Sequence, residues 1–126
     1  MKRIIIKIGD LSLTAQLNGS STAGKIWDIL PIKSKTSTWG DEIYFPIPLK
    51  AGLEDGFAQE VVEIGDLGYW PEGNCFCIFF GDTPVSKPGE IRPASSVNVF
   101  GRLENDWEQL KSIKNDEPIV VEELTD

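Results

Sequence analysis

Residues 65–84 read GDLGYWPEGNCFCIFFGDTP, and this stretch decides the fold class. Its apolar run CFCIFF (75–80) lies between a turn-rich segment at 65–74 and the turn signal GDTP, so it predicts a buried β-strand. Successive side chains of a strand point to opposite faces. One face would carry Phe76, Ile78 and Phe80, and the other Cys75, Cys77 and Phe79.

Short strands also dominate the rest of the chain. β-Branched and alternating patterns predict strands at 3–8, 11–17, 60–64, 96–103 and 117–124, with short extended pieces on either side of Gly40-Asp41. In GDEIYF, Glu42 and Tyr44 would face one way and Ile43 and Phe45 the other. Helices are predicted after Ser20 or Ser21, ending at Pro31, and from Asn105 to about Lys114. About eight strands and two helices indicate a mainly antiparallel barrel or sandwich.

Length and charge narrow the class of protein. A chain of 126 residues, about 40% apolar, suits a single domain over residues 1–126. The net charge of −8 repels phosphate groups, so neither nucleic acid nor an anionic membrane is an expected partner. Without a long apolar segment, the sequence predicts a soluble, cytoplasmic protein.

The chain contains no histidine. This absence excludes Ser-His-Asp and Cys-His catalysis and any zinc site that uses imidazole ligands. The two cysteines are spaced i, i+2 on one strand face, about 6.5–7 Å apart at Cα, which is a poor geometry for a disulfide. We therefore interpret Cys75 and Cys77 as small buried hydrophobic residues, and we expect neither a metal site nor a cofactor.

Several polar groups have two interpretations. Five carboxylates lie next to the ends of predicted strands: Asp41, Glu42, Glu63, Asp66 and Asp82. They would cap turns, or two of them would perform acid–base catalysis if the fold brought them together. Arg92 precedes a proline in a loop, where it would be a surface charge or a clamp for a carboxylate or amide. Trp70-Pro71, on a glycine-rich turn, is typical of a pocket rim.

Three motifs together carry a family resemblance. They are TWGDEIYFPIP (38–48), EVVEIGDLGYWPEGNCFCIFFGDTP (60–84) and RPASSVNVFGRL (92–103). With these motifs the chain resembles the small cyclophilin-like proteins of bacteria and archaea. The resemblance covers nearly the whole chain. It implies a cyclophilin-like closed β-barrel of about eight strands with two capping helices, and a pocket on the outside of the barrel.

The resemblance does not carry the isomerase chemistry over directly. Prolyl-isomerase cyclophilins use an arginine that donates a hydrogen bond to the prolyl nitrogen, and here Glu42 stands where that arginine is expected. A carboxylate accepts hydrogen bonds and cannot donate them. An isomerase of this sequence would need another donor, for which Arg92 is the candidate.

We therefore expect a groove on the barrel that binds a small molecule or a peptide, neutral or positively charged. The residues predicted to line it are Glu42, Tyr44, Trp70, Phe80, Thr83 and Asn98. Two alternatives stay open, namely a peptidyl-prolyl isomerase with an altered site and a carboxylate enzyme that hydrolyses amides or sugars. A homodimer that pairs across the first strands is also open.

Overall fold

The chain begins with an antiparallel hairpin. The computed structural model describes residues 2–105 and 107–125 and places β1 at Arg3–Ile8 and β2 at Leu11–Leu17, as predicted. Gly9, with a φ of 57°, makes the tight turn between them. Helix α1 (Ser21–Asp28) follows, and the Ser20 hydroxyl accepts a hydrogen bond from the Ala23 amide, which confirms the predicted N-cap.

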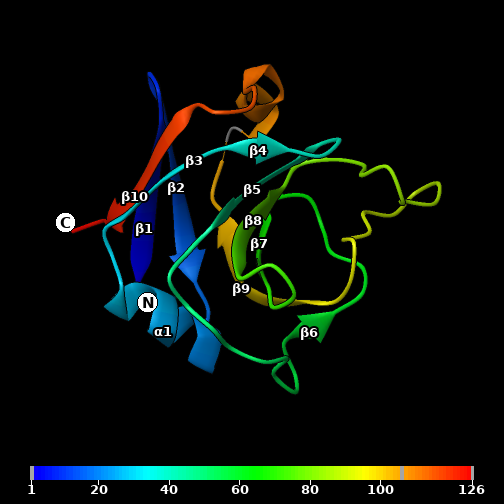
Figure 1. Cartoon of the computed structure of the whole chain (residues 1–126), viewed down its shortest axis with the longest axis horizontal. Helices are drawn as coiled ribbons and strands as arrows, with labels where there is room; N and C mark the ends of the chain where they lie inside the picture. Colours follow the sequence, from blue (N-terminus) through cyan, green and yellow to red (C-terminus); the bar gives the residue numbers. More distant parts are fainter. Residues whose placement is uncertain (1, 106, 126) are drawn as a thin grey trace.

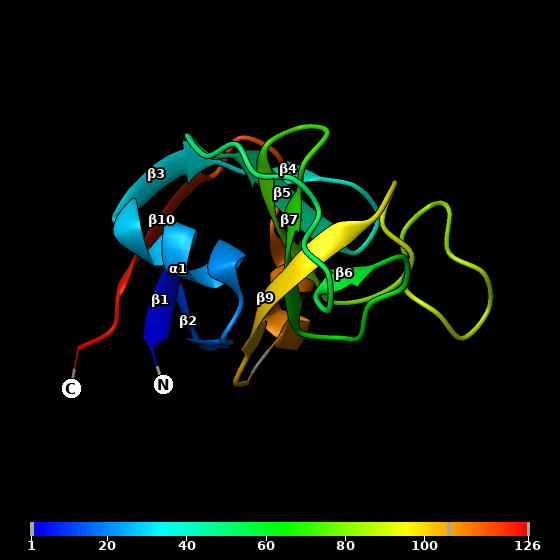
Figure 2. The same ribbon diagram turned by 90° about the horizontal axis from the view of Figure 1, so that it is seen from below.

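The strands form one antiparallel sheet that curls into a nearly closed barrel (Figures 1 and 2). Nine strands follow one another in the order β3-β10-β1-β2-β9-β7-β8-β5-β4 within the described residues, and β6 pairs with β9 outside this path. The remaining strands are β3 (Ile32–Lys35), β4 (Ser37–Thr38), β5 (Glu42–Pro46), β6 (Ala58–Gln59), β7 (Asp66–Trp70), β8 (Cys75–Phe79), β9 (Val97–Leu103) and β10 (Pro118–Glu123).

Thr36 joins the two ends of this strand order. It lies between β3, which pairs with β10, and β4, which pairs with β5. The Thr36 amide donates to the carbonyl of Glu117, and the Thr36 hydroxyl donates to the carbonyl of Lys114 over 2.7 Å. One extended segment therefore contributes to both edges of the sheet and brings the barrel close to closure.

Two sequence predictions need correction. The sequence pattern predicts turns over 65–74, but residues 66–70 form strand β7, which pairs with β8 and β9. Within the predicted strand at 60–64, the structure has an isolated bridge between Val62 and Ile91. Gly68 explains why 66–70 is a strand, because this glycine allows close packing and does not form a turn. A Cβ at this position would come within 2.8 Å of a Val97 methyl group.

The second helix is also shorter than predicted. Instead of an α-helix over 105–114, a 3-10 helix, η1, spans Trp107–Ser112. The start of the predicted helix includes residue 106, which lies outside the described residues. Figure 1 draws α1 and η1 at opposite ends of the strands. Within the described residues, no helix is long and apolar enough to cross a membrane.

The side-chain alternation of β8 divides the apolar residues into two clusters. Phe76, Ile78 and Phe80 face the barrel interior, where Phe76 stacks on Phe45 with ring centroids 4.8 Å apart. Cys75, Cys77 and Phe79 face outward into a second cluster with Val62, Ile91 and Val97. This confirms the predicted faces of 75–80. It also shows that the outside of the barrel has an apolar layer of its own beneath the loops.

Candidate functional site

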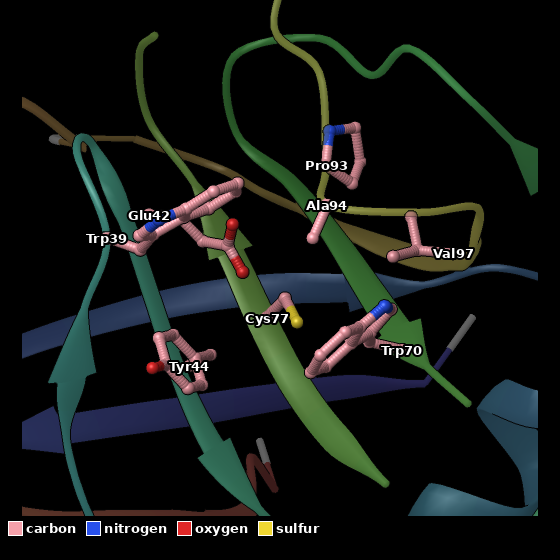
Figure 3. A pocket seen from close by; sticks show the side chains of 8 residues that line it. All are labelled: Trp39, Glu42, Tyr44, Trp70, Cys77, Pro93, Ala94 and Val97. Carbon is pink, nitrogen blue, oxygen red and sulfur yellow. The ribbon is translucent and has the colours of Figure 1, made fainter. Parts of the chain in front are cut away.

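The candidate site is a pocket of about 220 Å³ on the outer face of β5, β8 and β7, over the second cluster. Figure 3 shows side chains of β5 and its preceding turn on one side, Pro93, Ala94 and Val97 on the other, and Cys77 of β8 between them. The lining residues are Trp39, Glu42, Tyr44, Trp70, Cys77, Pro93, Ala94 and Val97.

Strand pairing explains how β5 delivers Glu42 and Tyr44 to this face. Their neighbours Ile43 and Phe45 are fully buried in the barrel interior, so the alternate residues must point outward. In the β5–β8 register, Tyr44 lies opposite Cys77. The predicted alternation of GDEIYF is therefore confirmed, and it places a carboxyl group and an aromatic ring beside the Cys77 thiol.

Trp39 reaches the pocket from the turn between β4 and β5. Its amide donates to the Glu42 carbonyl over 2.9 Å, which closes the turn. Gly40 adopts a φ of 61°, and a Cβ there would come within 2.7 Å of the Asp82 carbonyl oxygen. Glycine is thus required for the turn and also for the loop that packs against it.

A chain of hydrogen bonds holds the opposite wall. The Trp70 indole N–H donates to the Ser95 hydroxyl over 2.6 Å, and that hydroxyl donates to the carboxylate of Glu72. Ser95 follows directly after Pro93 and Ala94, which line the pocket. The bond therefore fixes the position of the loop wall relative to the Trp70 ring.

Glu42 is the chemically unusual group of the pocket. Its side chain is buried, with the residue 6% exposed, although it carries an ionisable carboxyl group. Burial raises the pKa of Glu42 from 4.5 to about 7, and a hydrogen bond with the Cys77 thiol partly offsets this rise. Burial also raises the pKa of the Cys77 thiol well above its ordinary range, and the charge of Glu42 adds to this effect. Near neutral pH the pocket therefore holds a protonated thiol and a carboxyl group in both protonation states.

Glu42 has no counter-charge in the pocket. Among the described residues that line it, none is lysine or arginine. Figure 3 shows the carboxylate directed into the space beside Cys77, between the rings of Trp39 and Tyr44 on one side and Trp70 on the other. A ligand that enters the pocket would meet one polar anchor on an otherwise largely apolar and aromatic wall.

Three of the six predicted groove residues lie elsewhere. Phe80 packs in the barrel interior. Thr83 is buried in the loop, where its hydroxyl bonds the Arg92 carbonyl and Ser86. Asn98 is fully buried and holds the 52–54 segment through the Gly52 carbonyl and the Glu54 amide. Core packing explains the position of Phe80, and hydrogen bonds explain those of Thr83 and Asn98, without a ligand.

The other three predicted residues, Glu42, Tyr44 and Trp70, do line the pocket. Sequence reasoning missed the residues of the loop wall, which no periodicity could bring to this face. It also missed Trp39, although the motif TWGDEIYF places it three residues before Glu42. Cys77 is buried as interpreted, and it additionally forms part of the pocket lining.

Three of the remaining charged candidates, Arg92, Glu63 and Asp66, form ion pairs outside the pocket. Arg92 pairs with Glu90, with 2.7 Å between Nε and Oε2, and Arg102 pairs with both Glu63 and Asp66. Among the described lining residues Glu42 is the single carboxylate, so the pocket lacks the pair that a carboxylate hydrolase needs. Nowhere in the described part of the chain do three His, Cys, Asp or Glu side chains gather as metal ligands.

Comparisons with known proteins agree with this fold. The chain is similar to the hypothetical protein AF2241 from Archaeoglobus fulgidus, known from a solution structure, with 39% identity and a TM-score of 0.81 over 98% of this chain and 95% of that one. It also resembles McbB, solved in complex with tryptophan, with 14% identity and a TM-score of 0.72 over 98% of this chain and 46% of McbB. A comparison with curated proteins finds no match. The family model described as cyclophilin-like matches residues 2–122, and the chain therefore belongs to the cyclophilin-like family.

Proposed function

We propose that this domain binds a small organic molecule, or a side chain of a short peptide, in the pocket on the outer face of the barrel. The observation that carries the proposal is the buried carboxyl group of Glu42, which faces the pocket without a cationic neighbour among the described lining residues. A protein stabilises such a group poorly by itself, because burial disfavours the charged form. A ligand that supplies a positive charge or a hydrogen-bond donor would replace the stabilisation by water that the carboxylate loses on burial.

The neighbouring hollow supports the choice of this pocket. A wider depression of about 590 Å³ lies between residues 61–64 and 81–91. Of its three lining carboxylates, Glu63 and Glu90 pair with arginines, and Asp82 is exposed to solvent instead of buried. The pocket at Glu42 combines apolar walls with an unmatched polar group, which is the usual composition of a small-ligand site.

The raised pKa of Glu42 supports a second candidate, a prolyl isomerase with an altered site. An ionised carboxylate can only accept hydrogen bonds, and Glu42 would then be no donor. With a pKa of about 7, a substantial fraction of Glu42 is protonated at neutral pH and can donate one. A protonated Glu42 could therefore bond the prolyl nitrogen. Arg92 is less well placed for this role, because it is not among the residues that line the pocket and its guanidinium pairs with Glu90.

The two candidates differ in their pH dependence. A cationic ligand needs ionised Glu42, so its affinity should rise as the pH increases through about 7. Isomerase activity that needs protonated Glu42 should fall over the same range. The titratable groups beside Glu42 are Asp41 and Tyr44 on its own segment and the thiols of Cys75 and Cys77 on β8, and burial raises the pKa of both thiols. The loop wall contributes Pro93 and Ala94, which carry no charge.

Tryptophan fluorescence provides the test. Two of the four tryptophans, Trp39 and Trp70, line the pocket, so a Trp27→Phe, Trp107→Phe background leaves both reporters at the site. The panel read by fluorescence contains alkylamines and a short X-Pro peptide. Tryptamine and tryptophan fluoresce themselves, so their binding is followed by calorimetry; tryptophan is chosen because McbB was solved with it. The peptide is also assayed for isomerisation at pH 6 and pH 8.

We expect at least one amine to bind with an affinity that rises with pH and is lost in Glu42→Gln. Glu60→Gln is the matched control, because Glu60 is an exposed carboxylate outside the pocket lining. Binding that survives Glu42→Gln unchanged would show that Glu42 is not the anchor. Isomerisation that is faster at pH 6 and absent in Glu42→Gln would favour the second candidate.

A further inference from the structure

Three aromatic side chains line the pocket, two from strands and one from a turn. Trp39 lies on the turn before β5, Tyr44 on β5 and Trp70 at the end of β7. Figure 3 shows the three rings arranged around the Glu42 carboxylate and the Cys77 sulfur. The faces of aromatic rings carry partial negative charge, so rings that surround one space attract a cation placed between them.

The carboxylate adds a full negative charge to this space. Glu42 is buried, and among the described lining residues no lysine or arginine neutralises it. The aromatic rings and the carboxylate are independent features with the same electrostatic preference. Together they select a positively charged group over a neutral group of equal size.

The pocket offers few acceptors for a primary ammonium group, which has three N–H donors to satisfy. The Tyr44 hydroxyl points away from Cys77 in Figure 3, and the Trp70 N–H is a donor already bound to Ser95. Beyond the Glu42 carboxylate, the walls presented to a cation are aromatic rings and the apolar surfaces of Pro93 and Val97. Methyl groups on nitrogen suit such walls better than N–H bonds do.

We propose that the pocket is an aromatic cage for an N-methylated ammonium group, formed by Trp39, Tyr44 and Trp70 with Glu42 as the counter-charge. The proposal rests on the proposed function of this pocket as a ligand site and names its ligand chemistry. A dimethylammonium group fits best, because its single N–H can bond the carboxylate while its methyl groups contact the rings. The group could belong to a free amine or to a methylated lysine side chain of a peptide.

Four compounds test the cage, three of nearly equal shape and one, ethanolamine, without the methyl groups. They are N,N-dimethylethanolamine, choline, unmethylated ethanolamine, and 3,3-dimethylbutan-1-ol, in which carbon replaces the charged nitrogen of choline. Binding is followed by calorimetry and by the NMR shifts of the Val97 methyl groups, which report on the pocket itself. We expect the two methylated amines to bind at least about tenfold more tightly than the other two, the scale of one desolvated cation–π contact.

Variants separate the parts of the cage. Trp39→Leu keeps an apolar wall without a π face and should remove most of the preference for methylated amines. Glu42→Gln keeps the shape without the charge and should remove most of the preference for choline over 3,3-dimethylbutan-1-ol. Trp107→Leu, outside the pocket, and Glu60→Gln should leave both preferences unchanged. If Trp39→Leu does not fold, Trp39→Phe, which should retain part of the preference, replaces it. A peptide with dimethyl-lysine and its unmethylated twin form a second arm, and the tighter of the two methylated ligands identifies the source.

Equal binding of 3,3-dimethylbutan-1-ol and choline would overturn the cage and leave the pocket as a site for neutral apolar ligands, so the proposed function would stand. Equal binding of ethanolamine and its dimethyl form would overturn the role of the methyl groups. If no methylated amine or peptide shifts the Val97 signals, the cage is wrong, and the wider fluorescence panel then decides separately whether the pocket binds ligands at all.

Discussion

Replacing Glu42 by glutamine should stabilise the protein at alkaline pH and change little at acidic pH. Burial raises the pKa of Glu42 from 4.5 to about 7 in the folded protein, whereas the unfolded chain keeps the ordinary value. Well below pH 4.5 the carboxyl group is protonated in both the folded and the unfolded state, so it does not reduce the free energy of unfolding. Between pH 4.5 and about 7 the unfolded chain releases the proton first, so the free energy of unfolding falls as the pH rises.

The size of the effect follows from the same values. At about 1.4 kcal/mol per pH unit, a rise from 4.5 to about 7 corresponds to about 3 kcal/mol of stability lost above pH 7. Glutamine has nearly the same shape and no charge to bury, so Glu42→Gln should recover up to about 3 kcal/mol at pH 8 and close to none at pH 4. The assay is urea unfolding of wild type, Glu42→Gln and the exposed control Glu60→Gln at both pH values. A difference between Glu42→Gln and wild type that is the same at pH 4 and pH 8 would refute the reasoning.

Three further predictions concern the frame around the pocket. Asn98→Ala should lower the free energy of unfolding by about 3 kcal/mol in urea titrations, because it leaves the Glu54 amide and the Gly52 carbonyl without partners. It should not change the affinity of a pocket ligand, and a loss of affinity would make Asn98 a binding residue. Gly101→Ala should cost about 3 kcal/mol in the same measurement, since its Cβ would come within 2.5 Å of the Gln16 carbonyl oxygen, and an unchanged urea midpoint would contradict the packing of β2 on β9. The thiols of Cys75 and Cys77 should react with a disulfide reagent at pH 8 after unfolding and very slowly before it, because burial raises both pKa values; fast reaction of the native protein would contradict their burial.

The interior and exterior faces of the barrel could be predicted because strand periodicity is a local signal. The alternation of CFCIFF and of GDEIYF correctly separated the residues of the interior from those of the outer face. From that separation followed the placement of Glu42 and Tyr44 on one side of β5. The roles of the glycines were harder to predict, because a glycine can mark either a turn, as Gly40 does, or close packing within a strand, as Gly68 does.

The site was predictable in part for the same reason. Phe80 shares a face with Phe76 and Ile78 and so belongs to the interior, a conclusion that the sequence pattern already contained. Thr83 and Asn98 are held by hydrogen bonds to residues outside their own strand or turn, which a local sequence pattern cannot predict. The protonation of Glu42 also depends on its burial by residues distant in sequence, and this is why the sequence alone suggested an ionised carboxylate.

The most direct measurement is a ¹³C NMR titration of the Glu42 side-chain carboxyl in the free protein and in the presence of N,N-dimethylethanolamine. We expect the free carboxyl to titrate near pH 7 and the bound cation to lower its pKa, because the ionised form then has a partner. A free carboxyl that titrates near 4.5, or a pKa that the amine at saturation leaves unchanged, would contradict the central role of Glu42 in this pocket.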